Sequence, residues 1–419
     1  MNVFFSAIGG AGIGPLAMVA KDAGHRVFGS DKQESRYVDY LRSKGIEIHI
    51  GQSSEFIEKI NSKAPIDWYV YSSAVLMENA KFPEIDFCQA NNIKTTKRDE
   101  FINFILEDKK LKLIAIAGTH GKTTTTAMTI WLMKELGIPV SYSLGAKISF
   151  GEIGEYNAES QYFVYEADEF DRNFLKFHPN ISIISGVDYD HPDIYPTRQD
   201  YYKAFNDFLC QSQNVIAHRE DLERIGWAGQ EDSVNADQIK LIGEVNRKNA
   251  QLVVEAISTI CEVPVDKLIE IINKFPGVSR RFEKISKNLY SDYAHTPEKI
   301  KGALQIAQEA ANDKVIVVYE GLHNTRQHFI KNDLRHLFDD VSKLYVVPSY
   351  LARENQSLEM LTPEKLITLI ANPEKAEPME LNNNLKTKIL KHTDSGELVL
   401  CLTAGGGGSL DEWLRKEFA

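Results

Sequence analysis

The 419-residue sequence has only four cysteines, Cys88, Cys210, Cys261 and Cys401, and no two of them lie close together along the chain. A Cys-x-x-Cys metal or redox motif is therefore absent, and we expect four buried or unreactive thiols, as is usual in the reducing cytosol. The sequence also lacks a run of about 18 apolar residues, which disfavours a membrane-spanning helix. These absences predict a cytoplasmic protein that does not insert into membranes.

Positive charge is scarce as well, since 48 Lys and Arg residues against 59 Asp and Glu residues give a formal net charge of −11. A nonspecific nucleic-acid binder needs a basic surface, so we expect no nucleic-acid partner. A local loop can still bind phosphate inside an acidic protein. The 43% hydrophobic and 26% charged residues are ordinary for a globular protein and exclude disorder of the whole chain. Nothing in the composition indicates a protein partner.

The first twenty residues are largely apolar, as in a secretory signal peptide. However, no Lys or Arg precedes the apolar segment, and Gly9, Gly10, Gly12, Gly14 and Pro15 interrupt it. A signal peptide needs a basic start and a continuous apolar core. We therefore interpret this segment as a strand, a glycine-rich loop and a helix.

Short β-rich runs alternate with longer amphipathic segments along the chain. Several runs, such as Leu113–Ala117 and Ile181–Ser185, are largely apolar, which is typical of strands covered by helices on both faces. The alternation predicts an α/β fold with mostly parallel sheets. At roughly 150 residues per domain the length allows three domains, and interruptions of the pattern place them at residues 1–107, 108–279 and 280–419.

Residues 114–126 read IAIAGTHGKTTTT, an apolar strand that enters a glycine turn and continues into a helix opened by Lys122 and Thr123. In such a loop backbone N–H groups surround a phosphate chain, and the helix N-terminus adds partial positive charge. We expect Lys122 to reach the β- and γ-phosphates of a nucleotide, and the Thr123 hydroxyl to bind Mg²⁺. Ile116 occupies the first glycine position of the general P-loop pattern.

The narrower string AGTHGKTT resembles that of the Mur ligases, the ATP-dependent amide ligases of peptidoglycan precursor synthesis. Further motifs of the family follow in family order, from Ile8 to Gly408. The resemblance implies an N-terminal Rossmann-like UDP-binding domain, a central P-loop ATPase domain and a C-terminal Rossmann-like domain. It also implies that ATP is bound by Gly118, Thr119, His120, Gly121, Lys122, Thr123 and Thr124.

Two strand ends carry acidic residues, in FVYEADEFD at residues 163–171 and in VDYDH at residues 187–191. The first would most often be a solvated acidic loop, but strand ends of α/β sheets face the ligand crevice, and Mg²⁺ takes oxygen ligands. The resemblance assigns a metal ligand to Glu166 and a ligand of a second ion to His191. With Thr123, these residues are expected to hold two Mg²⁺ ions. Gly186 stands where the family usually has asparagine.

Two later segments resemble the family's other ATP-binding motifs. In GEVNRKNA the spacing puts Asn246 and Asn249 on one helix face, like the family pair that holds the adenine, although Asn246 alone could equally be a helix N-cap. The string SRRFE, at the boundary to the last domain, resembles the one whose arginine faces the ATP phosphates. We match that arginine to Arg280 first and to Arg281 second.

The string SDYAHTP, residues 291–297, is similar to the family segment that meets both ATP and the amino acid. The resemblance places Asp292 at the ribose of the nucleotide and Tyr293 and His295 near the incoming amino acid. Arg326 closes the string YEGLHNTR and matches an arginine of the alanine-adding branch of the family. Tyr293, His295 and Arg326 are therefore our candidates for amino-acid binding.

The rest of that string leaves the identity of the amine substrate undecided between L-alanine and a tripeptide. Leu322 and His323 replace a His-Arg pair of the alanine-adding enzymes, whereas Glu320, Asn324 and Thr325 match the related ligase that recycles a whole tripeptide. Against the tripeptide ligase, the segment EFDRNFLKFHP has the shorter spacing of the alanine-adding enzymes.

The N-terminal glycine loop is not a dinucleotide fingerprint, because Pro15 occupies the third glycine position of GxGxxG. It resembles the start of the Mur ligases, which holds the diphosphate of a UDP-sugar; a helix-packing role for the glycines is the alternative. The resemblance implies a UDP-sugar site formed by Gly9, Gly10, Ala11, Gly12, Ile13, Gly14, Asp31, Ser72 and Ser73.

Together the motifs favour ATP-dependent ligation of L-alanine to UDP-N-acetylmuramate through an acyl phosphate, with Lys122, His191 and Arg280 as the catalytic residues. The alternative within the family is the tripeptide-recycling ligase. Two hypotheses come from other classes: a dehydrogenase built on the first glycine loop, and a P-loop switch without ligase chemistry. The dehydrogenase has no use for Lys122, Glu166 and His191, and the switch would release phosphate regardless of UDP-sugar and amino acid.

Overall fold

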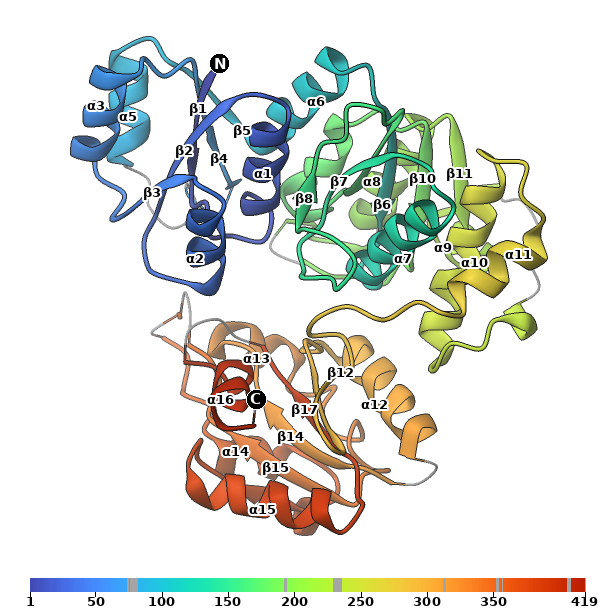
Figure 1. Ribbon diagram of the computed structural model, residues 1–419. Coiled ribbons are helices and arrows are strands. Elements are labelled where there is room, and N and C mark those ends of the chain that lie inside the picture. Colours follow the sequence, from blue (N-terminus) through green and yellow to red (C-terminus); the bar gives the residue numbers. More distant parts are fainter. Residues whose placement is uncertain are drawn as a thin grey trace. The chain divides into compact units, whose positions relative to one another are not determined.

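The computed structural model describes residues 1–73, 75, 82–191, 194–228, 236–311, 314–351, 354–355, 357–404 and 408–418. The chain forms two compact units, one made of Met1–Lys240 with Lys248–Pro276 and the other of Leu241–Arg247 with Gly277–Ala419. Three mostly parallel sheets with accompanying helices occur within the described ranges (Figure 1), which confirms the expected α/β class. The expected domain boundaries themselves stay predictions.

The first sheet belongs to the first unit. Its strands and helices are β1 (Asn2–Ser6), α1 (Gly14–Asp22), β2 (Arg26–Asp31), α2 (Arg36–Ser43), β3 (Glu47–Ile50), α3 (Ser54–Lys63), β4 (Trp68–Tyr71), α5 (Pro83–Ala90), β5 (Lys94–Lys97) and α6 (Arg98–Asp108). The order is β3-β2-β1-β4-β5, with parallel pairings. In Figure 1, α3 and α5 lie on one side of this sheet and α1 and α6 on the other. The order reverses at β1, and sheets of this kind bind ligands beyond the strand ends at that point, where the glycine loop lies.

The second sheet, also in the first unit, has the order β11-β10-β6-β9-β7-β8, and only β8 runs antiparallel to its neighbour among the described pairings. Its strands are β6 (Lys112–Ala117), β7 (Val140–Ser143), β8 (Gly154–Glu155), β9 (Tyr162–Glu166), β10 (Ile181–Ile184) and β11 (Asn214–Ala217). The accompanying helices are α7 (Lys122–Glu135), η1 (Phe170–Lys176), α8 (Arg198–Cys210), α9 (Arg219–Ile225), η2 (Ala236–Gln238), α10 (Glu244–Ser258) and α11 (Val265–Ile272). Ile114–Ala117 are fully buried, as expected of a central strand with both faces covered.

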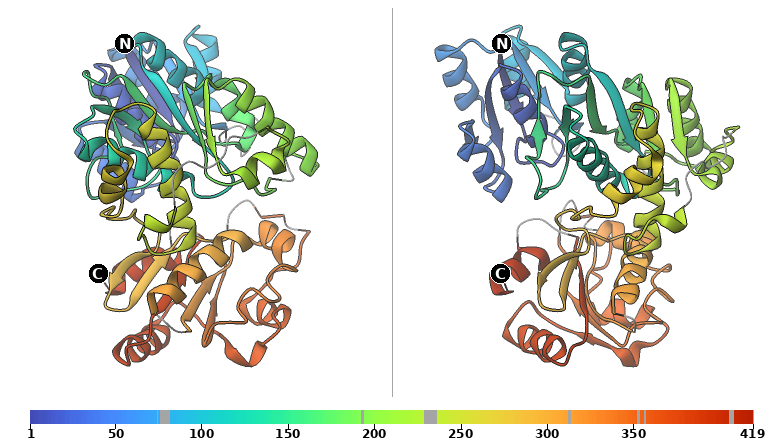
Figure 2. Two further views of the ribbon diagram at one scale, coloured as in Figure 1. Left: turned by 90° about the vertical axis from the view of Figure 1, so that its right-hand side faces the viewer. Right: turned by 45° about the vertical axis from the view of Figure 1, so that its right-hand side comes forward.

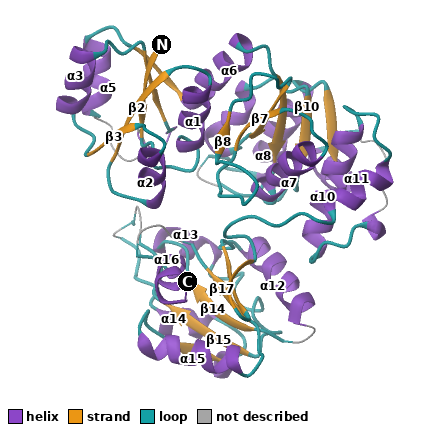
Figure 3. Cartoon of the chain, viewed as in Figure 1, coloured by secondary structure: helices purple, strands orange, loops and turns teal. Residues whose placement is uncertain are grey.

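The second unit holds the third sheet, of order β12-β13-β17-β14-β15-β16, in which β12 is antiparallel to β13 and the other pairings are parallel. Its elements are β12 (Glu283–Ser286), β13 (Leu289–Asp292), α12 (Pro297–Ala311), β14 (Ile316–Glu320), α13 (Asn324–Ile330), β15 (Lys343–Val347), α14 (Pro363–Leu369), η3 (Pro373–Lys375), β16 (Ala376–Pro378), α15 (Asn383–Asp394), β17 (Val399–Leu402) and α16 (Leu410–Phe418). One face packs against α12 and α14, and the other against α15 and α16 (Figure 3).

One hydrophobic core joins the first two sheets. It includes apolar side chains of β1, α1 and α6 together with those of β6, β9 and α8. At Gly154 an added Cβ would overlap with the backbone of Pro15, so a glycine lets β8 touch α1. Figure 2 shows the helices and sheets of each unit from two further directions. Within the described ranges, no helix is long and apolar enough to cross a membrane.

Candidate active site

The loop between β6 and α7 is shaped by two glycines with left-handed backbones. Gly118 has φ +142°, and a Cβ there would lie 2.6 Å from Ser185 Oγ. Gly121 has φ +80° and caps α7, and a Cβ there would lie 2.9 Å from Asn249 Oδ1. Any other residue would therefore be strained at both positions. The structure thus has a buried strand, a tight glycine turn and a helix that begins at Lys122, the order expected from the sequence.

Lys122 is held inside the protein by an acidic partner. Its ammonium donates to Glu169 Oε2 over 2.6 Å and to the carbonyl of Gly118, and the two side chains of the ion pair are only 17% and 2% exposed. Burial opposes the charged form, but the carboxylates of Glu169 and Asp168 outweigh it and raise the pKa of Lys122. Lys122 is therefore a fixed cation at the N-terminus of α7.

Thr123 and Glu166 lie together, as predicted. The Thr123 hydroxyl donates to Glu166 Oε2 over 3.1 Å, and the backbone N–H of Gly145 donates to Glu166 Oε1, also over 3.1 Å. Within the described ranges, no group of three or more His, Cys, Asp or Glu side chains is placed to hold a metal ion. Mg²⁺ usually takes one or two carboxylates and completes its shell with phosphate oxygens and water. The hydroxyl and carboxylate at the start of α7 fit that demand.

His191 lies near Glu169, the acidic partner of Lys122. Its Nε2 is 3.8 Å from Glu169 Oε1 and 3.8 Å from Asp190 Oδ2, and its ring packs against Phe170 with 5.1 Å between ring centroids. Glu169 therefore links His191 to Lys122. Glu169 belongs to the acidic segment at residues 163–171, and nothing in the pattern of that segment separates it from its neighbours.

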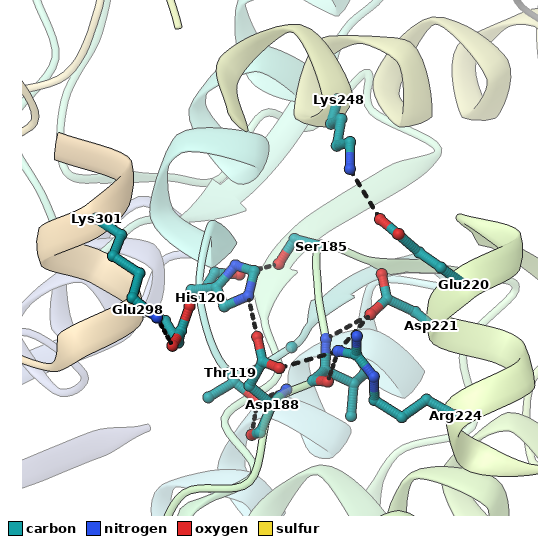
Figure 4. Close-up of polar contacts among 12 residues, drawn as sticks. Thr119, His120, Ser185, Asp188, Glu220, Asp221, Arg224, Lys248, Glu298 and Lys301 are labelled. Atoms are coloured by element: carbon teal, nitrogen blue, oxygen red, sulfur yellow. Dashed lines mark hydrogen bonds and ion pairs between the residues drawn. The ribbon is translucent and has the colours of Figure 1, made fainter. Parts of the chain in front are cut away.

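His120 occupies the space that the unusual glycine leaves. A hydrogen bond of 2.8 Å joins its Nε2 to Asp188 Oδ2, and Arg224 donates to Asp188 Oδ1 over 2.9 Å (Figure 4). A Cβ at Gly186, whose φ is +141°, would overlap with Cε1 of the His120 ring and lie 2.8 Å from each of its two ring nitrogens. The Thr119 hydroxyl donates to the Asp188 carbonyl over 2.6 Å. Gly186 therefore leaves room for the His120 ring, and Asp188 links His120, Thr119 and Arg224.

The two asparagines of α10 have different surroundings. Asn249 is 2% exposed and lies against Gly121 of the glycine turn. Asn246 donates from Nδ2 to the carbonyl of Ile242 over 2.8 Å, which is a local helix-terminal contact. Thr124 lies half-buried in the first turn of α7. Asn249 thus lies beside the predicted nucleotide loop, and Asn246 makes a hydrogen bond at the start of its own helix. The adenine-binding role of the two residues stays a prediction.

In the second unit, Asp292 ends β13 beneath the arginine pair. Its Oδ2 accepts the backbone N–H of Phe282 over 2.7 Å. Burial raises the pKa of this carboxyl to about 6, against the lowering effect of Arg281 and Arg280. Arg280 and Phe282 have positive φ values of 60° and 46°, which L-residues rarely adopt. The hydrogen bond from Phe282 N–H to Asp292 thus joins the strained segment, residues 280–282, to the buried carboxylate.

The predicted amino-acid-binding residues lie close together in the same unit. The guanidinium of Arg280 lies 4.1 Å from the centre of the Tyr293 ring, which packs edge-on against His295 with 4.7 Å between centroids. Burial, with the charges of Lys299 and Arg326, lowers the pKa of His295 well below its usual value. His295 is therefore neutral at physiological pH and able to accept or donate a hydrogen bond.

The residues that match the string of the tripeptide ligase make hydrogen bonds within the second unit. Glu320 is 1% exposed and accepts the backbone N–H groups of Ala404 and Leu410, each over 2.9 Å. Asn324 and Thr325 bond to the segment that precedes α14. Their internal hydrogen bonds explain these residues without any reference to the amine substrate.

The N-terminal glycine loop is organised by Asp31. The Gly9 N–H donates to Asp31 Oδ2 over 2.8 Å, and Gln33 N–H donates to Oδ1 over 3.3 Å. Gly14 has a packing role, because its Cβ would lie 2.9 Å from the carbonyl of Ile8. Asp31 therefore holds the glycine loop through the Gly9 N–H. It is one of the residues predicted to form the sugar-nucleotide site.

The remaining residues of this predicted site lie next to the acidic segment of the second sheet. A Cβ at Gly145 would lie 3.5 Å from the Ala11 carbonyl oxygen and 3.6 Å from Glu166 Oε1. Ser73, which follows Ser72 at the end of β4, and Lys97 bond to Asp171, and despite burial they lower the pKa of that carboxyl. Gly10 accepts the backbone N–H groups of Ile13 and Gly14, and Gly12 faces a side chain of α6. The first glycine loop and the nucleotide loop thus belong to one continuous region of the first unit.

Comparison with known proteins agrees with this arrangement. Residues 2–110 match the sequence model described as the Mur ligase family catalytic domain, and residues 116–234 match that of the Mur ligase middle domain. The two matches together cover more than half of the chain. The chain belongs to the Mur ligase family.

Its curated relatives and structural neighbours come from the same family. The UDP-N-acetylmuramate–L-alanine ligase of Clostridium novyi is 29% identical over 396 residues, which cover 85% of this chain and 84% of the relative. That of Desulforamulus reducens is 28% identical over 461 residues, covering 99% and 97%. The solved UDP-N-acetylmuramate-alanine ligase of Thermotoga maritima has a TM-score of 0.75 at 23% identity and covers 100% of this chain and 98% of its own. A murein peptide ligase of Psychrobacter arcticus has a TM-score of 0.65 at 21% identity, with full coverage of both chains. These structures confirm the expected three-domain Mur ligase fold.

Proposed function

We propose that the protein is an ATP-dependent ligase that joins L-alanine to UDP-N-acetylmuramate. The observation that carries the proposal is the buried Lys122–Glu169 pair beside Thr123 and Glu166, in a chain similar over most of its length to ligases with that activity. The internal bonds of Glu320, Asn324 and Thr325 remove the main sequence argument for a tripeptide instead of L-alanine.

The reaction joins two anions before it forms an amide. A carboxylate oxygen of the sugar acid attacks the γ-phosphorus of ATP, the bond to the β,γ-bridging oxygen breaks, and ADP leaves. The amine of L-alanine then attacks the carbonyl of the acyl phosphate, loses a proton, and expels inorganic phosphate. Lys122 supplies a fixed positive charge where the transferred phosphoryl group must lie. Because Glu169 holds its ammonium by a short ion pair, the lysine is in place before the nucleotide binds.

Thr123 and Glu166 would hold one Mg²⁺ ion, and His191 would bind a second. Bound Mg²⁺ neutralises charge on phosphate oxygens and fixes their geometry. We assign the adenine side of the nucleotide to Asn249, and to Asn246 with less support from its contacts. The glycine loop from Gly9 to Gly14 would hold the sugar-nucleotide diphosphate, with Asp31 below it.

The second unit carries the remaining predicted residues. Arg280 would face the ATP phosphates and Asp292 the ribose, and Tyr293, His295 and Arg326 would receive the amino acid. The neutral state of His295, caused by burial and neighbouring cations, suits a residue that contacts an amine or a carboxylate through hydrogen bonds.

The experiment is a phosphate-release assay with ATP, Mg²⁺ and UDP-N-acetylmuramate, to which L-alanine, glycine, L-serine or the L-alanyl-γ-D-glutamyl-diaminopimelate tripeptide is added in separate reactions. We expect turnover with L-alanine that also requires the UDP-sugar, and none in the Lys122→Met variant. Turnover with the tripeptide alone would contradict the L-alanine assignment. Phosphate release that is independent of both UDP-sugar and amine would contradict ligase activity.

A further inference from the structure

Arg98 is the first residue of α6, and its guanidinium lies between the first glycine loop and the acidic segment after β9. Its side chain is 15% exposed. Nη2 donates to Asp168 Oδ2 over 3.4 Å, which is long for an ion pair with a carboxylate. Within the described ranges this is the one hydrogen bond of a group that carries five N–H donors. A buried cation with such weak pairing is suited to bind a further anion.

Gly12 shows why the guanidinium can occupy that position. A Cβ at Gly12 would lie 3.0 Å from Arg98 Cζ and would overlap with Nη1. Gly12 does not have a positive φ, so an L-residue would be tolerated there by the backbone. Arg98, not the backbone conformation, therefore demands glycine at position 12.

The residues around Arg98 indicate which kind of anion would bind it. Next to Gly12, Ala11 faces Gly145, whose backbone N–H donates to the Glu166 carboxylate. The same loop continues into the N-terminus of α1, which begins at Gly14. The N-terminal end of a helix carries partial positive charge, which favours a bound anion. A diphosphate on this loop would therefore meet the forked N–H donors of Arg98 on the side that faces the phosphoryl-transfer residues.

We propose that Arg98 binds the diphosphate of the sugar nucleotide and thereby positions the sugar acid toward Glu166 and Lys122. This inference rests on the proposed function. The planar fork of an arginine matches two phosphate oxygens, which a lysine at the same position would not do. Asp168 orients the guanidinium through its single bond, and Gly12 leaves the space.

The test is the dissociation constant of UDP and of UDP-N-acetylmuramate, measured by calorimetry with saturating ADP and Mg²⁺ so that the nucleotide loop is already filled. For Arg98→Met we expect both constants to rise about 10- to 100-fold, the usual effect of losing a charge-assisted bond. Arg98→Lys should recover part of the loss. The ADP constant, measured alone, should not change, and in turnover KM for the sugar nucleotide should rise far more than kcat falls.

Gly12→Ala provides an independent perturbation, because the added methyl displaces the guanidinium without removing it. We expect it to weaken UDP binding in the wild-type background and to have no further effect in the Arg98→Met background. Arg26→Met, which removes an exposed charge at the start of β2, is the matched control and should leave both constants unchanged.

Three outcomes would overturn the inference. Unchanged UDP affinity in Arg98→Met with a lowered melting temperature would make Arg98 a structural residue. A loss confined to UDP-N-acetylmuramate, with UDP unaffected, would place Arg98 at the sugar carboxylate instead of the diphosphate. Additive losses in the double variant would remove the link to Gly12. Failure of the wild-type protein to bind either ligand would instead contradict the proposed function.

Discussion

Replacing Lys122 with methionine should destabilise the first unit as well as abolish turnover. The substitution keeps the length of the side chain but removes the cation from a carboxylate, Glu169, that is only 2% exposed. Loss of one partner of a buried ion pair typically costs about 3–5 kcal/mol, because the other charge stays desolvated. For a unit of this size, each kcal/mol lowers the melting temperature by roughly 2–4 °C. We therefore expect Lys122→Met to melt about 6–20 °C below the wild type.

The double variant Lys122→Met/Glu169→Gln separates the ion pair from the packing. With both charges removed no uncompensated carboxylate remains, so at least half of the lost stability should return although the protein stays inactive. Melting curves recorded without nucleotide at pH 8 provide the measurement.

Lys203→Met is the matched control. It breaks an ion pair with Asp207 on α8 whose side chains are 73% and 46% exposed, and such surface pairs contribute about 0–1 kcal/mol. Its melting temperature should therefore stay close to that of the wild type. If Lys122→Met melts like this control, or if the double variant is as unstable as the sum of its two single variants, Lys122 and Glu169 do not form a buried ion pair that stabilises the first unit.

Further predictions concern three other residues. Asp292→Asn should stabilise the protein at pH 7–8. The folded carboxyl has a pKa of about 6 against an ordinary 3.8, so the free energy of unfolding of the wild type falls by up to about 3 kcal/mol as pH rises between these values. Denaturant unfolding from pH 4 to 8 should show a smaller fall for the variant. Gly186→Ala should cost about 1–3 kcal/mol through its positive φ and its overlap with His120, and the additional change His120→Ala should relieve part of that cost in the same unfolding assay. Asp31→Ala should weaken binding of UDP-N-acetylmuramate more than binding of ATP, because it removes the acceptor of the Gly9 N–H; equal losses in calorimetry would contradict two separate sites.

Local sequence patterns were sufficient for the elements that carry the nucleotide loop. The apolar run Leu113–Ala117 became β6, and Ile181–Ser185 became β10 with a single residue of difference at its end. These strands are buried on both faces, so hydrophobicity alone specifies them. The helix after the glycine turn could be placed because Gly121 and Lys122 mark its start.

Contacts between segments that are distant in the sequence could not be predicted from local patterns. Glu169 pairs with a residue 47 positions earlier, and Arg98 reaches a glycine of the first loop, so both depend on how separate strands and helices pack. Glu320 shows what a motif leaves out: it stands in a family-like string, and in the structure it accepts two backbone N–H groups inside the second unit. Backbone N–H groups that are buried without a backbone partner need another acceptor, and a buried carboxylate can supply it. A sequence motif does not show which N–H groups packing will leave in this position.

In the proposed reaction, a carboxylate oxygen of UDP-N-acetylmuramate attacks ATP before the amine of L-alanine attacks the acyl phosphate. It can be tested with UDP-N-acetylmuramate whose carboxylate carries oxygen-18, incubated with ATP, Mg²⁺ and L-alanine. Mass spectrometry of the released phosphate should then show one label atom in each phosphate formed, with the amide product retaining the other. Phosphate without label, formed at the same rate as ADP, would show that water attacks ATP and would contradict the account.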